Sequence, residues 1–348
     1  MTKTSTSAPK FHAQSAVKLP DGWANDRQFP FPPEPRWAEL SDTLTQALPL
    51  WGLRGFAATL VAARENLVYR IDAPQPLALR LHRRGMRSAA QLVSELEWMA
   101  ALAERGLSVP CPHPALSGAL CHDVDGQIVD VLGWLDGVPM CLGGHLNPLV
   151  DGLTAYHALG QAMAQLHLKS DDWRPPPGFD RPIWDAQGLL GEAPLWGRFW
   201  ENPLLTPAQS ALMTQARHHA LARLSHLRDA DYGLIHADLV QENVLIGPGG
   251  PHLIDFDDAG FGYRLFDMAT VLNFILREAN PAPLQEAFVQ GYLATRPLDL
   301  KALPLFQALR AFSYVGWIVP RLSEDGAKAR QTRFVTLACQ MAEQMLAS

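Results

Sequence analysis

The sequence predicts an α+β fold with two lobes, and three observations support this prediction. The chain has 348 residues, which is more than one average domain needs. Short strand-like apolar stretches surround one amphipathic helix pattern before residue 135, whereas helical periodicity dominates after residue 154. We therefore expect a partly flexible N-terminal extension at 1–45, a small N-terminal lobe with an antiparallel sheet and one helix at 46–135, and a larger, mainly helical lobe at 136–348.

The composition narrows the possible classes of protein. Hydrophobic residues make up 48% of the chain and charged residues 18%, which suits a protein with a sizeable core. A net charge of −6 and a pI near 6.0 predict no nucleic-acid partner. The sequence contains no apolar run of about 18 residues, so we expect no membrane span. It also lacks the apolar core of a signal peptide, so a cytoplasmic protein is expected. We expect a monomer or a homodimer.

Cysteines give no sign of a disulfide framework or a zinc site. Four cysteines in a chain of this length are too few for a disulfide scaffold. Two of them lie near histidines, but their spacing matches no common zinc pattern. We therefore interpret this group as incidental: Cys111, His113, Cys121 and His122.

The N-terminal lobe is predicted from alternating apolar patterns and turn residues. Ser88 is a plausible helix cap, and Asp125-Gly126 is a typical hairpin turn. The elements expected in chain order are a helix at 38–50, strands at 57–63, 67–71 and 77–82, a helix at 88–105 and a hairpin at 118–135.

The C-terminal lobe is predicted to be mainly helical. Its middle part, residues 170–204, is rich in Pro, Trp and Asp, and loops of that length are uncommon unless they are functional. The expected helices lie at 154–168, 206–228, from Asp267 onward, and within 282–348.

One stretch between residues 233 and 270 carries the strongest functional signal. Three short apolar runs alternate there with polar residues, and a Gly/Pro turn at 247–251 separates the second run from the third. Two short strands joined by such a turn form a hairpin. The hairpin is expected to bring Asp238, Asn243 and Asp255 into one small space.

These three residues suit phosphoryl transfer from ATP. One carboxylate can orient the attacking hydroxyl and accept its proton, while an amide oxygen and a second carboxylate can hold Mg²⁺. The spacing from His236 to Asp238 and Asn243, with Asp255 on the next strand, is typical of kinases. A β-hairpin with polar ends is the alternative, but three ordered polar groups beside apolar strands favour the kinase interpretation.

The segments HADLVQENVL and IDFDDAGFGYRLFDMA resemble the aminoglycoside phosphotransferase and type II homoserine kinase-like superfamily. Protein kinases usually carry Arg after the His and a DFG motif, whereas this chain has Ala237 and then Asp255-Phe256-Asp257. The resemblance covers about residues 50–320, and it extends to the bacterial stress-response kinase group. It implies a protein-kinase-like fold with ATP and Mg²⁺ as cofactors.

The resemblance also implies roles for residues near the motif. Asp238 would position the nucleophile, and His236 would brace the loop rather than move protons. Asn243 and Asp255 would bind Mg²⁺. Asp267 would brace the catalytic loop through hydrogen bonds, and a histidine in the helix at 154–168, His167, is expected to be a satisfied core residue.

Further residues are implied for nucleotide binding in the N-terminal lobe. Arg80 would hold the phosphates in place of a strand lysine, paired with Glu95 on the helix. Leu132 and Trp134 lie in the stretch expected to contact adenine. Asn66 would cover the phosphates, although no G-x-G-x-x-G is present and the same residues suit an ordinary hairpin tip.

The acceptor is not decided by the sequence. The resemblance implies a small-molecule hydroxyl acceptor that is homoserine-, choline- or aminoglycoside-like. A protein Ser/Thr kinase and a nucleotide-binding pseudokinase regulator remain alternatives, since fold analogy alone does not fix a substrate. A cationic acceptor would need carboxylates and an anionic one arginines; the candidates are Asp171, Asp172, Asp185 and Glu192, and Arg310 and Arg321.

Overall fold

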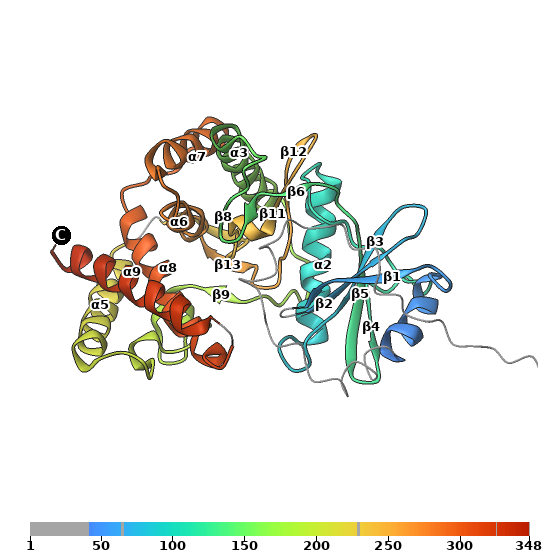
Figure 1. The fold of residues 1–348 in the computed structure, drawn as a ribbon, viewed down its shortest axis with the longest axis horizontal. Coiled ribbons are helices and arrows are strands. Elements are labelled where there is room, and N and C mark those ends of the chain that lie inside the picture. Colours follow the sequence, from blue (N-terminus) through green and yellow to red (C-terminus); the bar gives the residue numbers. More distant parts are fainter. Residues whose placement is uncertain (1–41, 64–65, 228–229, 325, 348) are drawn as a thin grey trace, which may run out of the picture.

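The computed structural model describes residues 42–63, 66–227, 230–324 and 326–347. It confirms the α+β prediction: an antiparallel sheet forms one end of the molecule and a group of helices forms the other (Figure 1). Most of the expected N-terminal extension lies outside the described residues. Among the described residues, no helix is long and apolar enough to cross a membrane.

The sheet of the N-terminal lobe has five antiparallel strands. Side chains alternate between its two faces, as they do in any strand. Leu77, Leu79 and Leu81 therefore face a helical segment at 42–51, which includes η1 (Leu48–Trp51), while Arg80 faces the other way. The strands run in the order β1 (Ala58–Ala63), β2 (Leu67–Ile71), β3 (Leu77–Leu81), β5 (Gln127–Gly133) and β4 (Cys121–Val124).

Helix α2 (Ala89–Glu104) lies between the sheet and the helical lobe (Figure 1). It starts at a capping box in which Ser88 and Gln91 exchange hydrogen bonds. Its Trp98 ring meets Phe256 edge to face, with ring centroids 5.4 Å apart. Four buried residues of α2 belong to the core of the C-terminal lobe: Leu96, Trp98, Met99 and Leu102. Packing therefore crosses the expected boundary at residue 135, which stays a prediction.

The helices of the C-terminal lobe lie near the predicted positions, although several of their ends differ. The helix expected at 154–168 begins at Gly152, because Asp151 caps it by accepting from Thr154 N–H. The helix expected to open at Asp267 begins at Arg264, directly after a strand, so Asp267 lies inside its first turn. The helices are α3 (Gly152–Asp171), α5 (Pro207–Ser225), α6 (Arg264–Ile275), α7 (Pro281–Thr295), α8 (Leu303–Trp317) and α9 (Ala327–Ala347).

Two small sheets support the stretch between residues 233 and 270. The predicted hairpin is formed by β11 (Val244–Gly247) and β12 (Gly250–Leu253), and β6 (Val138–Pro139) joins its edge. In the other sheet, β10 (Tyr232–Ile235) pairs with β13 (Gly260–Tyr263), which pairs in parallel with β9 (Ile183–Trp184).

Several short elements were not predicted, because two to five residues carry too little periodicity to be recognised. They include β9 and β13, which place the long 170–204 region directly beside the stretch between residues 233 and 270. The other short elements are β7 (Cys141–Leu142), β8 (His145–Leu146), α4 (Ala186–Leu190), η2 (Phe199–Glu201), η3 (Gln241–Asn243) and η4 (Val319–Arg321).

Candidate active site

The catalytic loop leaves β10 in a conformation that needs external support. Ala237 has φ +64°, a left-handed backbone that costs free energy in a residue other than Gly. The Asp267 carboxylate accepts hydrogen bonds from the N–H groups of His236, at 2.8 Å, and Ala237, at 2.6 Å. The first turn of α6 therefore holds the loop that presents Asp238.

Asp267 is itself held by a buried chain of polar groups. Its Oδ2 lies 3.1 Å from His167 Nε2, and His167 Nδ1 lies 2.8 Å from the Tyr292 hydroxyl. Burial lowers the pKa of His167 to about 4, so the ring is neutral at neutral pH. Burial opposes ionisation of Asp267, but its hydrogen bond from His167 and the nearby histidines keep the pKa of Asp267 below its usual value.

His236 is a fully buried residue beside the cleft. Burial lowers the pKa of its imidazole, and its Nε2 lies 3.1 Å from the carbonyl oxygen of Ile254 at the end of the hairpin. Its ring also packs on Phe256, with centroids 4.6 Å apart. These contacts join β10 to the segment that carries Asp255.

Asp238 is partly exposed to solvent while remaining tied to the protein. About a quarter of its side chain (26%) is exposed, and its Oδ1 accepts hydrogen bonds from Arg310 and, at 3.4 Å, from the Tyr314 hydroxyl. Desolvation raises the pKa of Asp238, and the Arg310 guanidinium opposes that rise. Asn243 donates its Nδ2 to the Asp238 carbonyl at 2.9 Å, which leaves Oδ1 as the amide atom that can meet a cation.

Asp255 follows the hairpin in a left-handed conformation, with φ +68°, and its side chain is exposed to solvent. Although Asp255 keeps contact with solvent, desolvation by the protein packed around it raises its pKa. Repulsion from three nearby carboxylates raises this pKa further: Asp257, Asp238 and Asp258. A cation placed among these groups would relieve that repulsion.

The donor set therefore fits Mg²⁺ bound together with phosphate. Within the described ranges no group of three or more His, Cys, Asp or Glu side chains is arranged to hold a metal. Mg²⁺ commonly takes one or two protein carboxylates and completes its octahedron with substrate phosphates and water. Asp255 and the oxygen of Asn243 are donors of the kind such a site uses.

Arg80 lies on strand β3, where its side chain is buried between carboxylates. Its Nη1 donates to Glu95 at 2.9 Å, so the structure brings together the two residues that the sequence analysis paired. Asp130, on the neighbouring strand β5, accepts from Nε at 2.8 Å and Nη2 at 2.7 Å. Sequence reasoning missed Asp130; the strand register that places it opposite Arg80 was its only signal.

The other predicted nucleotide-binding residues lie at the edge of the cleft. Asn66 donates to Asp257 at 2.6 Å, while the adjoining hairpin-tip residues 64–65 lie outside the described residues. Leu132 is buried in β5. The backbone N–H of Trp134 donates to the Pro76 carbonyl at 3.1 Å and its indole N–H donates to Asp136 at 3.0 Å, so neither donor is left for adenine.

None of the four carboxylates suggested for a cationic acceptor contacts the catalytic loop. Asp185 caps α4 by accepting from Gln187 and Gly188 N–H, and Asp172 is exposed at the end of α3. Asp171 and Glu192 form ion pairs with arginines: Arg264 and Arg296 for Asp171, and Arg217 for Glu192. Acidic residues at helix ends are thus used for capping and pairing here.

The two arginines suggested for an anionic acceptor are also engaged. Arg310 is fully buried and donates to Asp238 and, at 2.9 Å, to the Ala237 carbonyl. Arg321 lies over the Trp317 ring, with its Cζ 4.1 Å from the ring centroid. Arg310 is therefore engaged by Asp238, and its suggested contact with an acceptor stays a prediction.

A different group lies beside Asp238. The Trp196 ring lies 4.4 Å from the Arg310 Cζ, and its indole N–H donates to Asp258 Oδ1 at 3.4 Å. Asp258 also pairs with Arg87 at 2.9 Å. Aromatic side chains of α8 extend this wall, since Tyr314 packs near Trp196 with ring centroids 5.5 Å apart.

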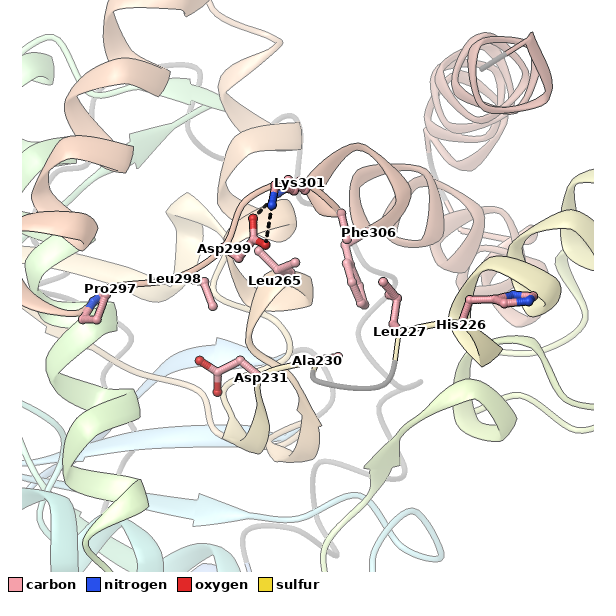
Figure 2. Close-up of a pocket in the computed structure, with 11 residues that line it drawn as sticks. His226, Leu227, Ala230, Asp231, Leu265, Pro297, Leu298, Asp299, Lys301 and Phe306 are labelled. Carbon is pink, nitrogen blue, oxygen red and sulfur yellow. Dashed lines mark hydrogen bonds and ion pairs between the residues drawn. The ribbon is translucent and has the colours of Figure 1, made fainter.

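A separate cavity of about 730 Å³ lies away from this site (Figure 2). It is bordered by the end of α5 and the α7–α8 connection, and the figure shows Lys301 directed to Asp299. None of the residues proposed for nucleotide or metal binding lines it. The lining residues are His226, Leu227, Ala230, Asp231, Leu265, Pro297, Leu298, Asp299, Lys301, Ala302 and Phe306.

Comparison with known proteins decides the family. Residues 58–305, well over half of the chain, match the phosphotransferase enzyme family. The chain belongs to this family. It is accordingly a kinase-type transferase that acts on hydroxyl groups, and its fold is the protein-kinase-like fold of the family's solved members.

Individual relatives are similar over most of their length. A homoserine kinase from Agrobacterium fabrum is 30% identical over 250 residues, which covers 68% of this chain and 72% of the relative. Amicoumacin kinase from Bacillus subtilis is 28% identical, covering 77% and 81%. The solved structure of a microcompartment-associated aminopropanol kinase superposes with a TM-score of 0.76 at 28% identity, covering 88% and 98%.

Proposed function

We propose that this phosphotransferase transfers the γ-phosphoryl group of Mg-ATP to the hydroxyl of a small amino alcohol. The observation that supports it most directly is the group of polar residues at the cleft. Asp238, Asn243 and Asp255 lie at the ends of paired strands, with the Arg80–Glu95 ion pair on the opposite lobe. Phosphoryl transfer needs little more than positioning and electrostatic stabilisation of this kind.

In this proposal each residue has one task. Asp238 accepts a hydrogen bond from the acceptor hydroxyl, orients it for attack and takes its proton as the bond to phosphorus forms. Asn243 and Asp255 bind Mg²⁺, which when bound neutralises charge on the phosphate oxygens. Arg80 directs positive charge at the phosphates, while Glu95 and Asp130 hold its guanidinium in place. His236 braces the loop without exchanging protons.

An amine on the acceptor is suggested by the wall beside Asp238. Asp258 offers a partly exposed carboxylate there, with 25% of its side chain accessible, and the Trp196 indole lies beside it. A carboxylate next to an aromatic ring suits an ammonium group. Two of the relatives are named for acceptors that carry both an amine and a hydroxyl, homoserine and aminopropanol.

The test is acceptor-dependent ADP release from purified protein across a panel of alcohols. We expect turnover with Mg-ATP and short amino alcohols, and none with the matching alcohols that lack the amine. Asp255→Ala should abolish turnover and weaken Mg-ATP binding, because the cation loses its protein carboxylate. An exposed-site variant, Asp172→Ala, is the control and should behave like the wild type.

Two outcomes would contradict the proposal. Nucleotide binding without turnover on any acceptor would favour a regulator, and transfer to protein Ser or Thr alone would favour a protein kinase. Equal turnover of the amine-free alcohols would remove the amine from the proposal while leaving phosphoryl transfer in place.

A further inference from the structure

Arg181 has a buried contact pattern that the proposed catalytic roles do not use. It lies just before β9, in the long region 170–204, and only 3% of it is exposed. Its Nε donates to the Ala259 carbonyl at 2.7 Å, and its Nη2 donates to the carbonyls of Phe256, at 2.6 Å, and Asp257, at 2.8 Å. One side chain therefore binds three of the four backbone carbonyls at residues 256–259, which directly follow Asp255.

The remaining nitrogen of Arg181 faces helix α2. Its Nη1 donates to Glu95 Oε2 at 3.1 Å and to the Gln91 carbonyl at 3.0 Å. The other oxygen of the same carboxylate, Glu95 Oε1, accepts from Arg80. A single guanidinium thus connects the ion pair proposed to serve the phosphates with the backbone that follows the proposed metal ligand.

The chain around Arg181 supports the same segment from one side. Trp184 donates its indole N–H to the Asp258 carbonyl at 2.8 Å, and the Pro182 carbonyl accepts from Phe261 N–H at 2.9 Å. The approach is so close that a Cβ on Gly260 would lie 2.1 Å from the Pro182 oxygen. Residues 181–184 therefore hold the backbone from Phe256 to Phe261 over its whole length.

Asp255 depends on this support because of its own backbone. A left-handed residue other than Gly persists only where the surrounding structure holds it. On one side the hairpin fixes Asp255 through the Ile254 N–H, which donates to the Asn243 carbonyl at 3.0 Å. On the other side, Arg181 holds the backbone that follows Asp255 by donating to the carbonyls of Phe256 and Asp257.

We propose that Arg181 is a positioning residue that fixes Asp255 relative to Glu95, and so couples the metal ligand to the phosphate-binding pair. This inference rests on the proposed function. The planar guanidinium donates to four carbonyls and a carboxylate at once, whereas an ammonium group cannot reproduce that geometry. Groups that orient a metal ligand typically affect metal affinity or activity by about 10–100-fold.

The alternative is that Arg181 only stabilises the core, and a matched variant separates the two. Arg217 is also a buried arginine: it donates to the Leu190 carbonyl at 2.7 Å, pairs with Glu192 and lies over the Trp200 ring. It lies on α5 and makes no contact with the catalytic loop or α2 among these interactions. Arg217→Gln should therefore cost stability without changing the response to metal.

The experiment measures how nucleotide binding depends on Mg²⁺, using calorimetric titration with a non-hydrolysable ATP analogue. For Arg181→Gln we expect the Mg²⁺ concentration at half-maximal binding to rise about 10–100-fold. Arg181→Lys should show a smaller rise, and Arg217→Gln should match the wild type. With an active acceptor, kcat of Arg181→Gln should fall at saturating substrates while the KM for the acceptor changes little.

The inference is overturned if Arg181→Gln keeps the wild-type Mg²⁺ requirement, or if Arg217→Gln shifts it equally. Should Arg181→Gln fail to fold, Arg181→Lys decides: an unchanged Mg²⁺ requirement in that variant also overturns the inference. Because the readout is binding, a wild-type protein that binds Mg-nucleotide but phosphorylates no acceptor would contradict the proposed function alone.

Discussion

At the scale of single residues, the cleft is built from charged groups whose neighbours decide what they can do. Asp238 and Arg310 illustrate this most clearly. The sequence marks Asp238 by its distance from Asn243, but nothing local marks Arg310, which lies on α8 more than seventy residues away. Its burial against Asp238 means that this carboxylate has its counter-charge within the protein.

The first prediction at this scale concerns Asp238→Asn, which keeps the size of the side chain but removes its charge. We expect kcat to fall by about 10²–10⁴, the range in which general-base assistance acts, while nucleotide affinity changes little. Single-turnover transfer and a nucleotide titration measure the two effects. Near-normal transfer would remove Asp238 from the mechanism, and lost nucleotide binding would reassign it as a metal ligand.

The wild-type pH profile extends this prediction. Asp238 acts when ionised, and desolvation raises its pKa, so kcat/KM should fall as the pH drops through a value above the usual range for aspartate. The Asp238→Asn variant should lack this acid limb. A wild-type profile that stays flat down to the ordinary pKa of aspartate, about 3.9, would contradict the assignment.

At the scale of elements, close helix packing supports the catalytic loop from behind. Helices α3 and α7 touch at two glycines: a Cβ on Gly160 would lie 2.1 Å from the Phe288 carbonyl oxygen, and one on Gly291 would lie 1.9 Å from that of His157. These helices carry His167 and Tyr292, the two groups behind Asp267. Their separation is therefore tied to the position of the loop.

We predict that Gly160→Ala destabilises the protein, because α7 must move away to admit the methyl group. Overpacking of this kind typically costs about 1–3 kcal/mol, which exceeds the helix propensity gained by replacing glycine. Urea unfolding measures the change in the free energy of unfolding. Gly249→Ala, at an exposed turn with no atom within 4 Å of the added Cβ, is the control, and equal stability of the two variants would refute the packing argument.

At the scale of the whole molecule, the two lobes are joined by more than the connecting chain. On helix α2, Glu95 forms an ion pair with Arg80 of the sheet, while Trp98 packs into the large core of the helical lobe. Arg181 and Asn66 add polar contacts between the two lobes. Stability of the helical lobe and geometry of the phosphate-binding pair are therefore linked.

The prediction at this scale is a pH dependence of global stability that comes from His167. Its folded pKa of about 4 lies below the ordinary value near 6.5, so between these values the unfolded chain binds more protons than the native one. The free energy of unfolding should therefore fall as the pH falls through this window. Between pH 7.5 and 5 the contribution is about 2 kcal/mol.

Urea unfolding of wild type and His167→Gln at these two pH values isolates the contribution. The variant should be less stable at pH 7.5 and should lose less stability on acidification. A surface variant, His218→Gln, should keep the wild-type slope. Identical slopes in wild type and His167→Gln would show that His167 titrates normally in the folded protein.

The sequence by itself determined the α+β class, the main strands and helices, and the positions of Asp238, Asn243, Asp255, Arg80 and Glu95. Each depends on local signals: periodicity, turn residues and short fixed spacings. The pairing of Arg80 with Glu95 was implied by the resemblance to the family, and the structure brings the two side chains together at 2.9 Å. Whether these residues act as assigned stays a prediction.

Only the tertiary structure decided which distant residues complete the site. Asp130, Arg181 and Arg310 reach the cleft from a neighbouring strand, a long irregular region and a late helix, and no spacing in the sequence relates them to the motif. The carboxylates suggested for the acceptor were misplaced for the same reason, since helix caps and ion pairs had already engaged Asp171 and Asp185. Buried charges need partners, and folding alone settles which partner each one meets.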